Sequence, residues 1–283
     1  MNLQLSLLQK YLKALAAISP KLASKKALQL FQTVRKKSIR DREKSFFATT
    51  FHINVPFYKG KLDVYTKGKA DGKIIFLVHG WDSNAGSLAM IADELVEKGY
   101  KIVALNLPGH AFDKSNKSNY FECKEAVKAM VKFVNPQNSV SFITHSFGSG
   151  VTAGALAELD IQVDKLFFIT SPYRLVDFFK QFKQMLKVGD KTYNYMIIWA
   201  NKLLGEDLNQ IKVDDKLKNV NFNHLFLIHD QKDKVLPYSN SMRIHNSIES
   251  CTLIPIEKAG HYRILWKKEV KDIILNNLIA VEV

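Results

Sequence analysis

The chain has 283 residues, of which 47% are hydrophobic and 24% charged, which is typical of a globular protein with a sizeable core. Its net charge of +14 comes from lysines spread along the chain without a stacking platform or recognition-helix pattern, so we expect no nucleic-acid partner. No apolar run reaches the ~20 residues of a membrane span, and the N-terminus lacks a signal-peptide pattern. Cys123 and Cys251 form neither a disulfide framework nor a zinc motif, so we predict a cytoplasmic protein.

Residues 1–42 are predicted to form a helical N-terminal extension. Two sets of apolar residues recur at helical spacing, Leu8, Leu12, Leu15 and Ile18, then Leu28, Phe31 and Val34. Ser19 and Pro20 are typical of a helix cap followed by the first helical position, which favours two short helices. We expect them to pack on the body of the protein. The alternative is a basic amphipathic segment, in which residues 1–18 make weak peripheral contact with a membrane.

Residues 43–283 are predicted to form one α/β domain. A period of two over 51–57, a turn at 59–61 and a second run over 62–65 indicate a β-hairpin. Further apolar strands are then expected, at 74–78, 102–105, 140–143, 166–169, 225–228 and 253–256. Helical stretches such as 87–99 and 121–134 separate them. This alternation favours a mostly parallel central sheet with helices on both faces, preceded by the antiparallel hairpin.

One interval is too long for a simple crossover between strands. Residues 172–223 are helical in pattern and rich in aromatic residues, whereas a crossover needs only about a dozen residues or more. We therefore predict an inserted helical cap over the carboxyl ends of the strands.

Residues 139–150 indicate a strand that enters a sharp turn and then a helix. The strand ends in Thr144-His145-Ser146-Phe147-Gly148, and small residues follow. A turn of this kind holds its central serine at strained backbone angles, and the usual pattern is G-x-S-x-G. Here Thr144 stands in place of the first glycine, whereas Gly148 supplies the second. Ser146 is therefore a candidate nucleophile.

The other polar residues of interest also follow predicted strands, where ligands of parallel sheets bind. His79-Gly80-Trp81-Asp82 follows the strand at 74–78, and the segment 229–237, which contains Asp233, follows the strand at 225–228. Gly260-His261 follows the last strand. A serine, an aspartate and a histidine on successive strand-end loops are in the order that a nucleophile, its orienting acid and its general base need.

With these motifs the chain resembles the α/β-hydrolase family, in particular uncharacterised bacterial, esterase-like members with a helical N-terminal extension. The resemblance spans nearly the whole chain and includes an H-G-W segment, an H-S-F-G elbow and a G-H-x-x-I-L ending. It implies an α/β-hydrolase fold with Ser146 as nucleophile, Asp233 as acid and His261 as base. It also implies an oxyanion hole formed by the backbone N–H groups of Trp81 and Phe147. The sequence departs from the family pattern at three positions, Thr144, Ser149 and Ala111.

Other assignments remain open for some of these residues. Asp230 competes with Asp233, but Asp-x-Val-x-Pro is how the resembling enzymes place the acid. We interpret His79, His145 and His229 as structural, hydrogen-bonding histidines. These histidines with the two aspartates could be imagined as a metal site, but no H-x-H or H-E-x-x-H spacing supports one, and we expect no metal and no cofactor.

The predicted function is hydrolysis of a carboxylic ester or thioester through an acyl-enzyme on Ser146. A serine at this position argues against dehalogenases and epoxide hydrolases, which attack with aspartate. Carbon–carbon bond hydrolases and acyltransferases share the serine and remain alternatives. A ligand-binding or membrane-associated protein with an inactive site is the alternative from another class.

The predicted partner is a small-molecule acyl substrate bound under the cap. Residues 175–186 have one broad apolar face with lysines opposite, and a second apolar helix follows. We expect four side chains from these helices to line the acyl pocket, Phe178, Phe182, Met185 and Trp199. Such a bounded, aromatic pocket would suit a short or medium neutral acyl group. The alternative is that these side chains only fill the core of the cap.

Overall fold

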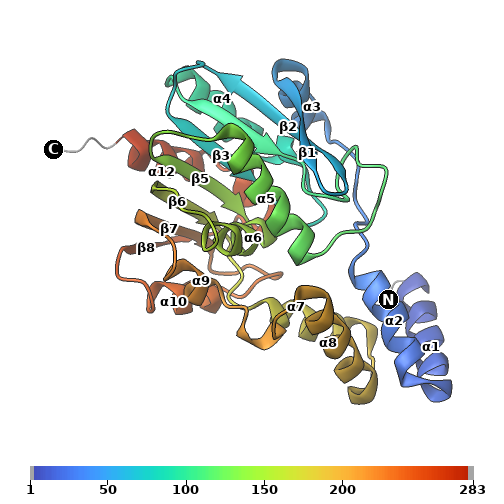
Figure 1. The fold of residues 1–283 in the computed structure, drawn as a ribbon. Coiled ribbons are helices and arrows are strands. Elements are labelled where there is room, and N and C mark those ends of the chain that lie inside the picture. Colours follow the sequence, from blue (N-terminus) through green and yellow to red (C-terminus); the bar gives the residue numbers. More distant parts are fainter. Residues whose placement is uncertain (1–2, 280–283) are drawn as a thin grey trace.

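The computed structural model describes residues 3–279, and its centre is one eight-stranded sheet (Figure 1). The strand order is β1-β2-β4-β3-β5-β6-β7-β8. In chain order the strands are β1 (Phe51–Phe57), β2 (Gly60–Gly68), β3 (Ile74–Val78), β4 (Lys101–Leu105), β5 (Val140–His145), β6 (Val163–Ile169), β7 (Phe222–Asp230) and β8 (Cys251–Ile256). The strands β1 and β2 form an antiparallel hairpin, β2 runs antiparallel to β4, and all later pairs are parallel. The predicted sheet is therefore confirmed.

Helices cover both faces of the sheet, and each face has its own core. The helices α5 (Tyr120–Val134) and α6 (Phe147–Leu156) cover one face, on which the rings of Phe76 and Phe142 stack with centroids 4.9 Å apart. The other face packs against α3 (Asp41–Thr49), α4 (Ala89–Glu97) and α12 (Lys268–Ile279). Because successive strand residues point to opposite faces, strands that are apolar throughout supply both cores.

Several short elements connect the strands and long helices. They are η1 (Ala85–Leu88), η2 (Leu208–Gln210), α9 (Val213–Leu217), α10 (Ser239–His245), α11 (Gly260–Arg263) and η3 (Ile264–Trp266). The sequence did not predict α3, which begins at Asp41, within the last two residues of the predicted extension. Its Phe46 is completely buried, and its buried Glu43 accepts a hydrogen bond from the Asn84 side chain at 2.9 Å.

The N-terminal extension begins with two helices, α1 (Leu3–Ile18) and α2 (Pro20–Phe31). The predicted break between them is present, and Ser19 Oγ accepts a hydrogen bond from the backbone N–H of Leu22 at 3.3 Å. The helical pattern predicted to reach Val34 stops at Phe31. Beyond it the backbone pairs with the loop before α5, and the Val34 N–H donates to the Asn116 carbonyl at 2.9 Å.

The extension packs on the rest of the chain as expected, with α1 and α2 against the cap and the residues after α2 against the loop before α5. The cap helices α7 (Leu175–Leu186) and α8 (Asp190–Leu204) lie beside α1 and α2 (Figure 1), and they also contact α6 and α5. The Phe31 ring lies 4.2 Å from that of Phe179 and 5.2 Å from that of Phe182, centroid to centroid. We call α1 and α2 together the α1–α2 hairpin. Its apolar face packs against the apolar face of α7. Within residues 3–279, no helix is long and apolar enough to cross a membrane.

Candidate active site

Ser146 lies in the sharp turn between β5 and α6. Its backbone has φ 53° and ψ −125°, an unusual conformation for a residue other than glycine. The turn needs a glycine at position 148, because a Cβ atom there would lie 2.5 Å from the His79 carbonyl oxygen and 2.6 Å from that of Val78. This close contact with the end of β3 brings Ser146 and the His79–Trp81 segment together.

The two departures from the glycine pattern around the elbow compensate for each other. Thr144 Oγ1 and Ser149 Oγ lie 2.8 Å apart, and both side chains are fully buried. A buried hydroxyl is costly without a hydrogen-bond partner, and here each hydroxyl supplies the partner of the other. The elbow is therefore tied across its base by a hydrogen bond.

Ser146, His261 and Asp233 form one chain of hydrogen bonds. Ser146 Oγ lies 2.9 Å from His261 Nε2, and His261 Nδ1 lies 2.7 Å from Asp233 Oδ2. The other oxygen of Asp233 accepts the backbone N–H groups of Val235 at 2.7 Å and Leu236 at 3.1 Å. The structure thus brings together the three residues that the sequence singled out.

Asp233 is held in its charged form. Burial alone would raise the pKa of its carboxyl group, but contacts with His229 and His261 and the N–H of Val235 outweigh burial and lower it. A charged carboxylate beside Nδ1 favours the tautomer in which Nδ1 carries the hydrogen. In that tautomer, His261 Nε2 is free to accept the Ser146 proton.

Asp230 has a different place in the site. Its Oδ2 accepts the backbone N–H groups of Ala259 and Gly260, the latter at 2.7 Å, and its Oδ1 accepts that of Lys232 at 2.7 Å. Burial raises the pKa of this carboxyl group, and the backbone donors lower it by more. Asp230 therefore fixes the loop that carries His261 without touching the imidazole. The sequence placed Asp230 near the site but gave no signal for this role.

The other three histidines at the strand ends have structural partners. His79 Nδ1 donates to the Gly80 carbonyl at 2.7 Å, and Nε2 accepts the Leu107 N–H at 3.0 Å. His145 Nε2 donates to the carbonyl of His261 at 2.9 Å, and burial lowers the pKa of His145 to about 3. His229 lies between Ser241 Oγ at 2.7 Å and the Leu236 carbonyl at 3.1 Å. Among the residues that the structure describes, no group of three or more His, Cys, Asp and Glu is placed to hold a metal ion.

Trp81 and Phe147 lie side by side next to Ser146, with ring centroids 5.2 Å apart. Phe147 is the first residue of α6, a position at which the backbone N–H has no acceptor within the helix. The extension anchors the loop that carries Trp81, because the Arg35 N–H donates to Asp82 Oδ1 at 2.7 Å and the Arg35 side chain pairs with Oδ2 at 3.2 Å. The sequence gave no sign of this link.

A cavity of about 600 Å³ lies over Ser146 and His261. The cap contributes to it as expected through Phe178, Phe182 and Met185. The extension contributes a second wall that sequence reasoning missed, formed by Leu5, Leu8, Leu28, Leu30 and Phe31. The helical spacing of Leu8 and of Leu28 and Phe31 indicated apolar faces, but it could not show which surface they would cover.

Trp199 does not line this cavity, contrary to the prediction. Its ring lies under the ammonium groups of Lys21 and Lys25, 5.9 and 5.2 Å from the ring centroid. The helix α8 instead turns Ala200, Leu203 and Leu204 toward the cavity. Trp199 packs against the lysines of the extension.

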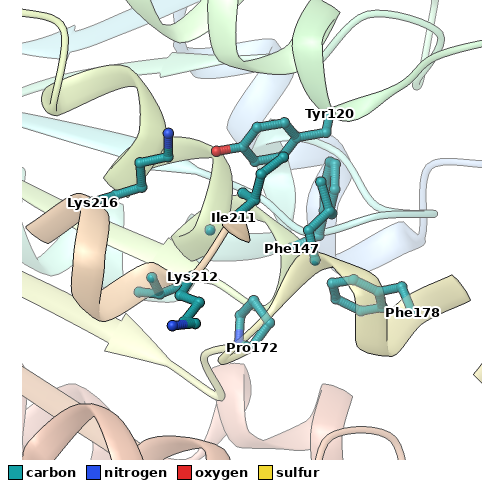
Figure 2. A pocket seen from close by; sticks show the side chains of 10 residues that line it. Tyr120, Phe147, Pro172, Phe178, Ile211, Lys212 and Lys216 are labelled. Carbon is teal, nitrogen blue, oxygen red and sulfur yellow. The ribbon is translucent and has the colours of Figure 1, made fainter. Parts of the chain in front are cut away.

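A second, much smaller cavity of about 10 Å³ lies behind Phe147 and Phe178 (Figure 2). The rings of these two residues are 6.1 Å apart, and both residues also line the large cavity. They therefore form a wall between the two spaces. The large cavity has to extend from Ser146 in the other direction, between the cap and the extension.

Solved structures with the same fold include several lipid and ester hydrolases. An esterase from Pyrococcus furiosus has a TM-score of 0.64 and 16% identity, over 87% of this chain and 96% of that one. Est1E from Butyrivibrio proteoclasticus, with ferulic acid bound, has a TM-score of 0.64 and 16% identity, over 80% and 99%. A bacterial membrane phospholipase A has a TM-score of 0.63 and 16% identity, over 84% and 88%. These identities establish a shared fold and nothing more.

A search of curated proteins found no match. A family model described as serine aminopeptidase S33 matches residues 69–219, more than half of the chain. This segment begins just before β3, and it includes the elbow and both cap helices. The chain belongs to this serine aminopeptidase S33 family of α/β-hydrolases.

Proposed function

We propose that the protein is a serine hydrolase of carboxylic esters or thioesters that forms an acyl-enzyme on Ser146. The chain of hydrogen bonds from Ser146 Oγ to His261 and on to Asp233, at 2.9 and 2.7 Å, carries this proposal. In the reaction, His261 Nε2 takes the proton of the Ser146 hydroxyl as the oxygen attacks the acyl carbonyl. Asp233 holds the imidazole in orientation and stabilises its positive charge.

The developing oxyanion needs donors on the side of the carbonyl away from His261. The backbone N–H groups of Trp81 and Phe147 are the proposed donors, and each such donor contributes roughly 3 kcal/mol to transition-state stabilisation. The imidazolium of His261 then gives its proton to the departing alcohol or thiol. A water molecule attacks the acyl-enzyme in the second half of the reaction, with His261 as base, and releases the acid.

The cavity favours an uncharged acyl group over the ammonium terminus of a peptide. Among the residues that line it, Asp82 alone is acidic, and its carboxylate is already paired with Arg35. An unpaired ammonium group buried among the aromatic and leucine side chains would cost several kcal/mol. The family is named for serine aminopeptidases, but among the described residues that line the cavity none offers an unpaired carboxylate to bind such a substrate.

The size of the cavity also bears on the acyl chain. The sequence alone favoured a short or medium chain, because it suggested a pocket bounded by the cap. The leucines of α1 and α2 extend the apolar wall beyond the cap, and the total volume of about 600 Å³ is within the range of sites for lipid- or drug-sized ligands. We therefore propose that long, single-chain acyl esters are better substrates than acetyl esters.

Labelling with a fluorophosphonate tests the proposal, because this probe reacts with activated serines. We expect mass spectrometry to find the probe on Ser146, and Ser146→Ala to abolish both the labelling and the hydrolysis of an aryl ester. His261→Ala should slow both reactions by several powers of ten. Thermal melting of each variant checks its fold. An unlabelled Ser146 in folded protein, or a tenth of the activity left in Ser146→Ala, would refute the mechanism.

A further inference from the structure

Helix α1 exposes a row of large apolar side chains. Leu3, Leu7, Tyr11 and Ile18 are 74, 57, 50 and 81% exposed, and their spacing of four, four and seven residues puts them on one face. On α2, Leu22 is 53% exposed. We call these five residues the outer row. Monomeric proteins seldom leave such a row in water, and where one occurs it commonly marks an interaction site.

The segment that carries the outer row contains basic residues and no acidic ones. The first 40 residues contain nine of the 41 Lys and Arg residues of the chain and none of the 27 Asp and Glu residues. They therefore carry +9 of the net charge of +14. Five of the nine are exposed lysines on the same two helices as the outer row, Lys10, Lys13, Lys21, Lys25 and Lys26.

The helix α8 of the cap, which packs against α2, exposes the same kinds of residue. Tyr195 and Ile198 are exposed on α8, and the exposed Lys191 and Lys202 lie four residues before the first and four after the second. These four side chains share one helical face. The combination of apolar residues and lysines therefore extends over more than one helix.

We propose that the outer face of the α1–α2 hairpin docks on an anionic membrane surface. A helix with exposed large apolar residues and flanking lysines lies in the plane of the lipid headgroups, with its apolar side chains inserted and its ammonium groups on the phosphates. A second copy of this chain is a poorer partner for the surface, because two faces of the same positive charge would repel each other.

If the proposed function is correct, docking through the outer row would bring the cavity close to its substrate. Gln9 of α1 donates to the backbone carbonyl of Met185 at 2.8 Å. Met185 and Leu203 line the cavity and are 38 and 46% exposed, so the cavity opens beside the hairpin. A lipid acyl chain could then pass from the membrane into the cavity without crossing water.

Vesicle binding tests the docking independently of catalysis. The full chain is sedimented with vesicles of phosphatidylcholine alone or with 30% phosphatidylglycerol. We expect binding to the anionic vesicles that weakens as salt is raised, because screening reduces the attraction of the lysines. Leu7→Gln combined with Ile18→Gln, and separately Lys10→Gln combined with Lys13→Gln, should each weaken the partition by about tenfold or more.

Matched controls come from surfaces away from the hairpin. Met242→Gln removes an apolar side chain that is 45% exposed on α10, and Lys69→Gln combined with Lys98→Gln removes two exposed lysines near β3 and α4. We expect all control variants to bind as the unaltered protein does, and thermal melting verifies that each variant is folded. The proposal is overturned if the unaltered protein ignores anionic vesicles, if controls and hairpin variants lose equal affinity, or if Leu7→Gln instead abolishes self-association. None of these outcomes depends on Ser146.

Discussion

Different interactions hold the two sides of the cavity, which we call its floor and its roof. Ser146, Asp233 and His261 on the floor come from three strand-end loops, and hydrogen bonds of 2.7 to 2.9 Å join them. The roof consists of α1, α2, α7 and α8, and it is held largely by contacts between apolar side chains, such as Phe31 on Phe179. A hydrogen bond fixes both the distance and the angle between its two groups, whereas an apolar contact mainly keeps two side chains close.

This difference teaches which changes each region tolerates. A small displacement on the floor removes an interaction needed in the transition state, so activity should fall by orders of magnitude. A change of side-chain size in the roof should alter which acyl chain fits, at a cost of about tenfold or less. The roof can therefore vary in substrate choice while the floor keeps the chemistry.

The largest expected effect comes from the two aspartates on the floor. Asp233→Asn should lower kcat/KM for an aryl ester by about 10⁴-fold, because an amide cannot hold the Nδ1–H tautomer of His261 or stabilise its charge. Asp230→Asn is the matched control, because it makes the same chemical change three residues away. It should mainly loosen the loop at Ala259 and Gly260 and lower the free energy of unfolding by about 1–3 kcal/mol.

Measuring the kinetics and the urea unfolding of both variants separates the two roles. One is to orient the His261 imidazole, and the other is to fix the loop that carries it. The reverse ranking of the two activities would assign the acid to Asp230. Equal losses of activity at equal stability would show that the floor tolerates neither change, and that the distinction between the two aspartates is wrong.

An intermediate effect on substrate preference is expected when a larger side chain in the roof fills part of the cavity. Leu8 lines the cavity, whereas its neighbour Leu7 is 57% exposed and is not among the residues that line it. Leu8→Trp should lower the ratio of kcat/KM for dodecanoyl over butanoyl aryl esters by about tenfold, because the larger ring occupies space for the chain. Leu7→Trp should leave the ratio unchanged.

A smaller substitution, Leu8→Phe, guards against misfolding and should shift the ratio in the same direction. If both leucines behave alike, or if the butanoyl ester suffers as much as the dodecanoyl ester, the extension does not bound the acyl site. Loss of activity on all esters would instead point to a disturbed floor.

The smallest expected effect concerns the hydroxyl pair beneath the elbow. Thr144→Val leaves the buried Ser149 hydroxyl without its partner at 2.8 Å and should lower the free energy of unfolding by about 1–3 kcal/mol. Adding Ser149→Ala removes the hydroxyl that has lost its partner. The double variant should therefore lose less free energy of unfolding than the two single variants lose together. Urea denaturation of the four proteins gives the coupling. Losses that add within about 0.5 kcal/mol would show that the pair is not coupled.

The sequence predicted the floor well because strand patterns are local. Each apolar run of the parallel sheet ends where a polar residue follows, and parallel strands bring those ends to one edge. The strand-end positions of Ser146, Asp233 and His261 could therefore be predicted without knowing the packing, whereas the choice of Asp233 over Asp230 rested on the resemblance to α/β-hydrolases. The compensation between Thr144 and Ser149 could not, because five residues of separation do not reveal that two side chains meet under a turn.

The roof was predicted less well because its helices could have packed in several ways. Periodicity identified the apolar faces of both the extension and the cap, but it does not say which faces meet. Met185 and Phe182 were placed correctly in the cavity, whereas Trp199 packs under Lys21 and Lys25. Cation–π contacts between distant segments leave no pattern in the sequence.

The hydrogen bond and ion pair between Arg35 and Asp82 join a residue outside the segment that the family model matches to a residue inside it. Asp82 lies within the segment that the family model matches, residues 69–219, and Arg35 lies well before it. The family segment thus supplies the loop beside Ser146, while a residue outside that segment holds the loop in place. The boundary of the matched segment is consequently not the boundary of the set of residues that hold the site together. Transferring residues 69–219 alone to another scaffold would carry over the elbow and the cap. It would leave out Arg35, which holds the Asp82 loop beside Ser146.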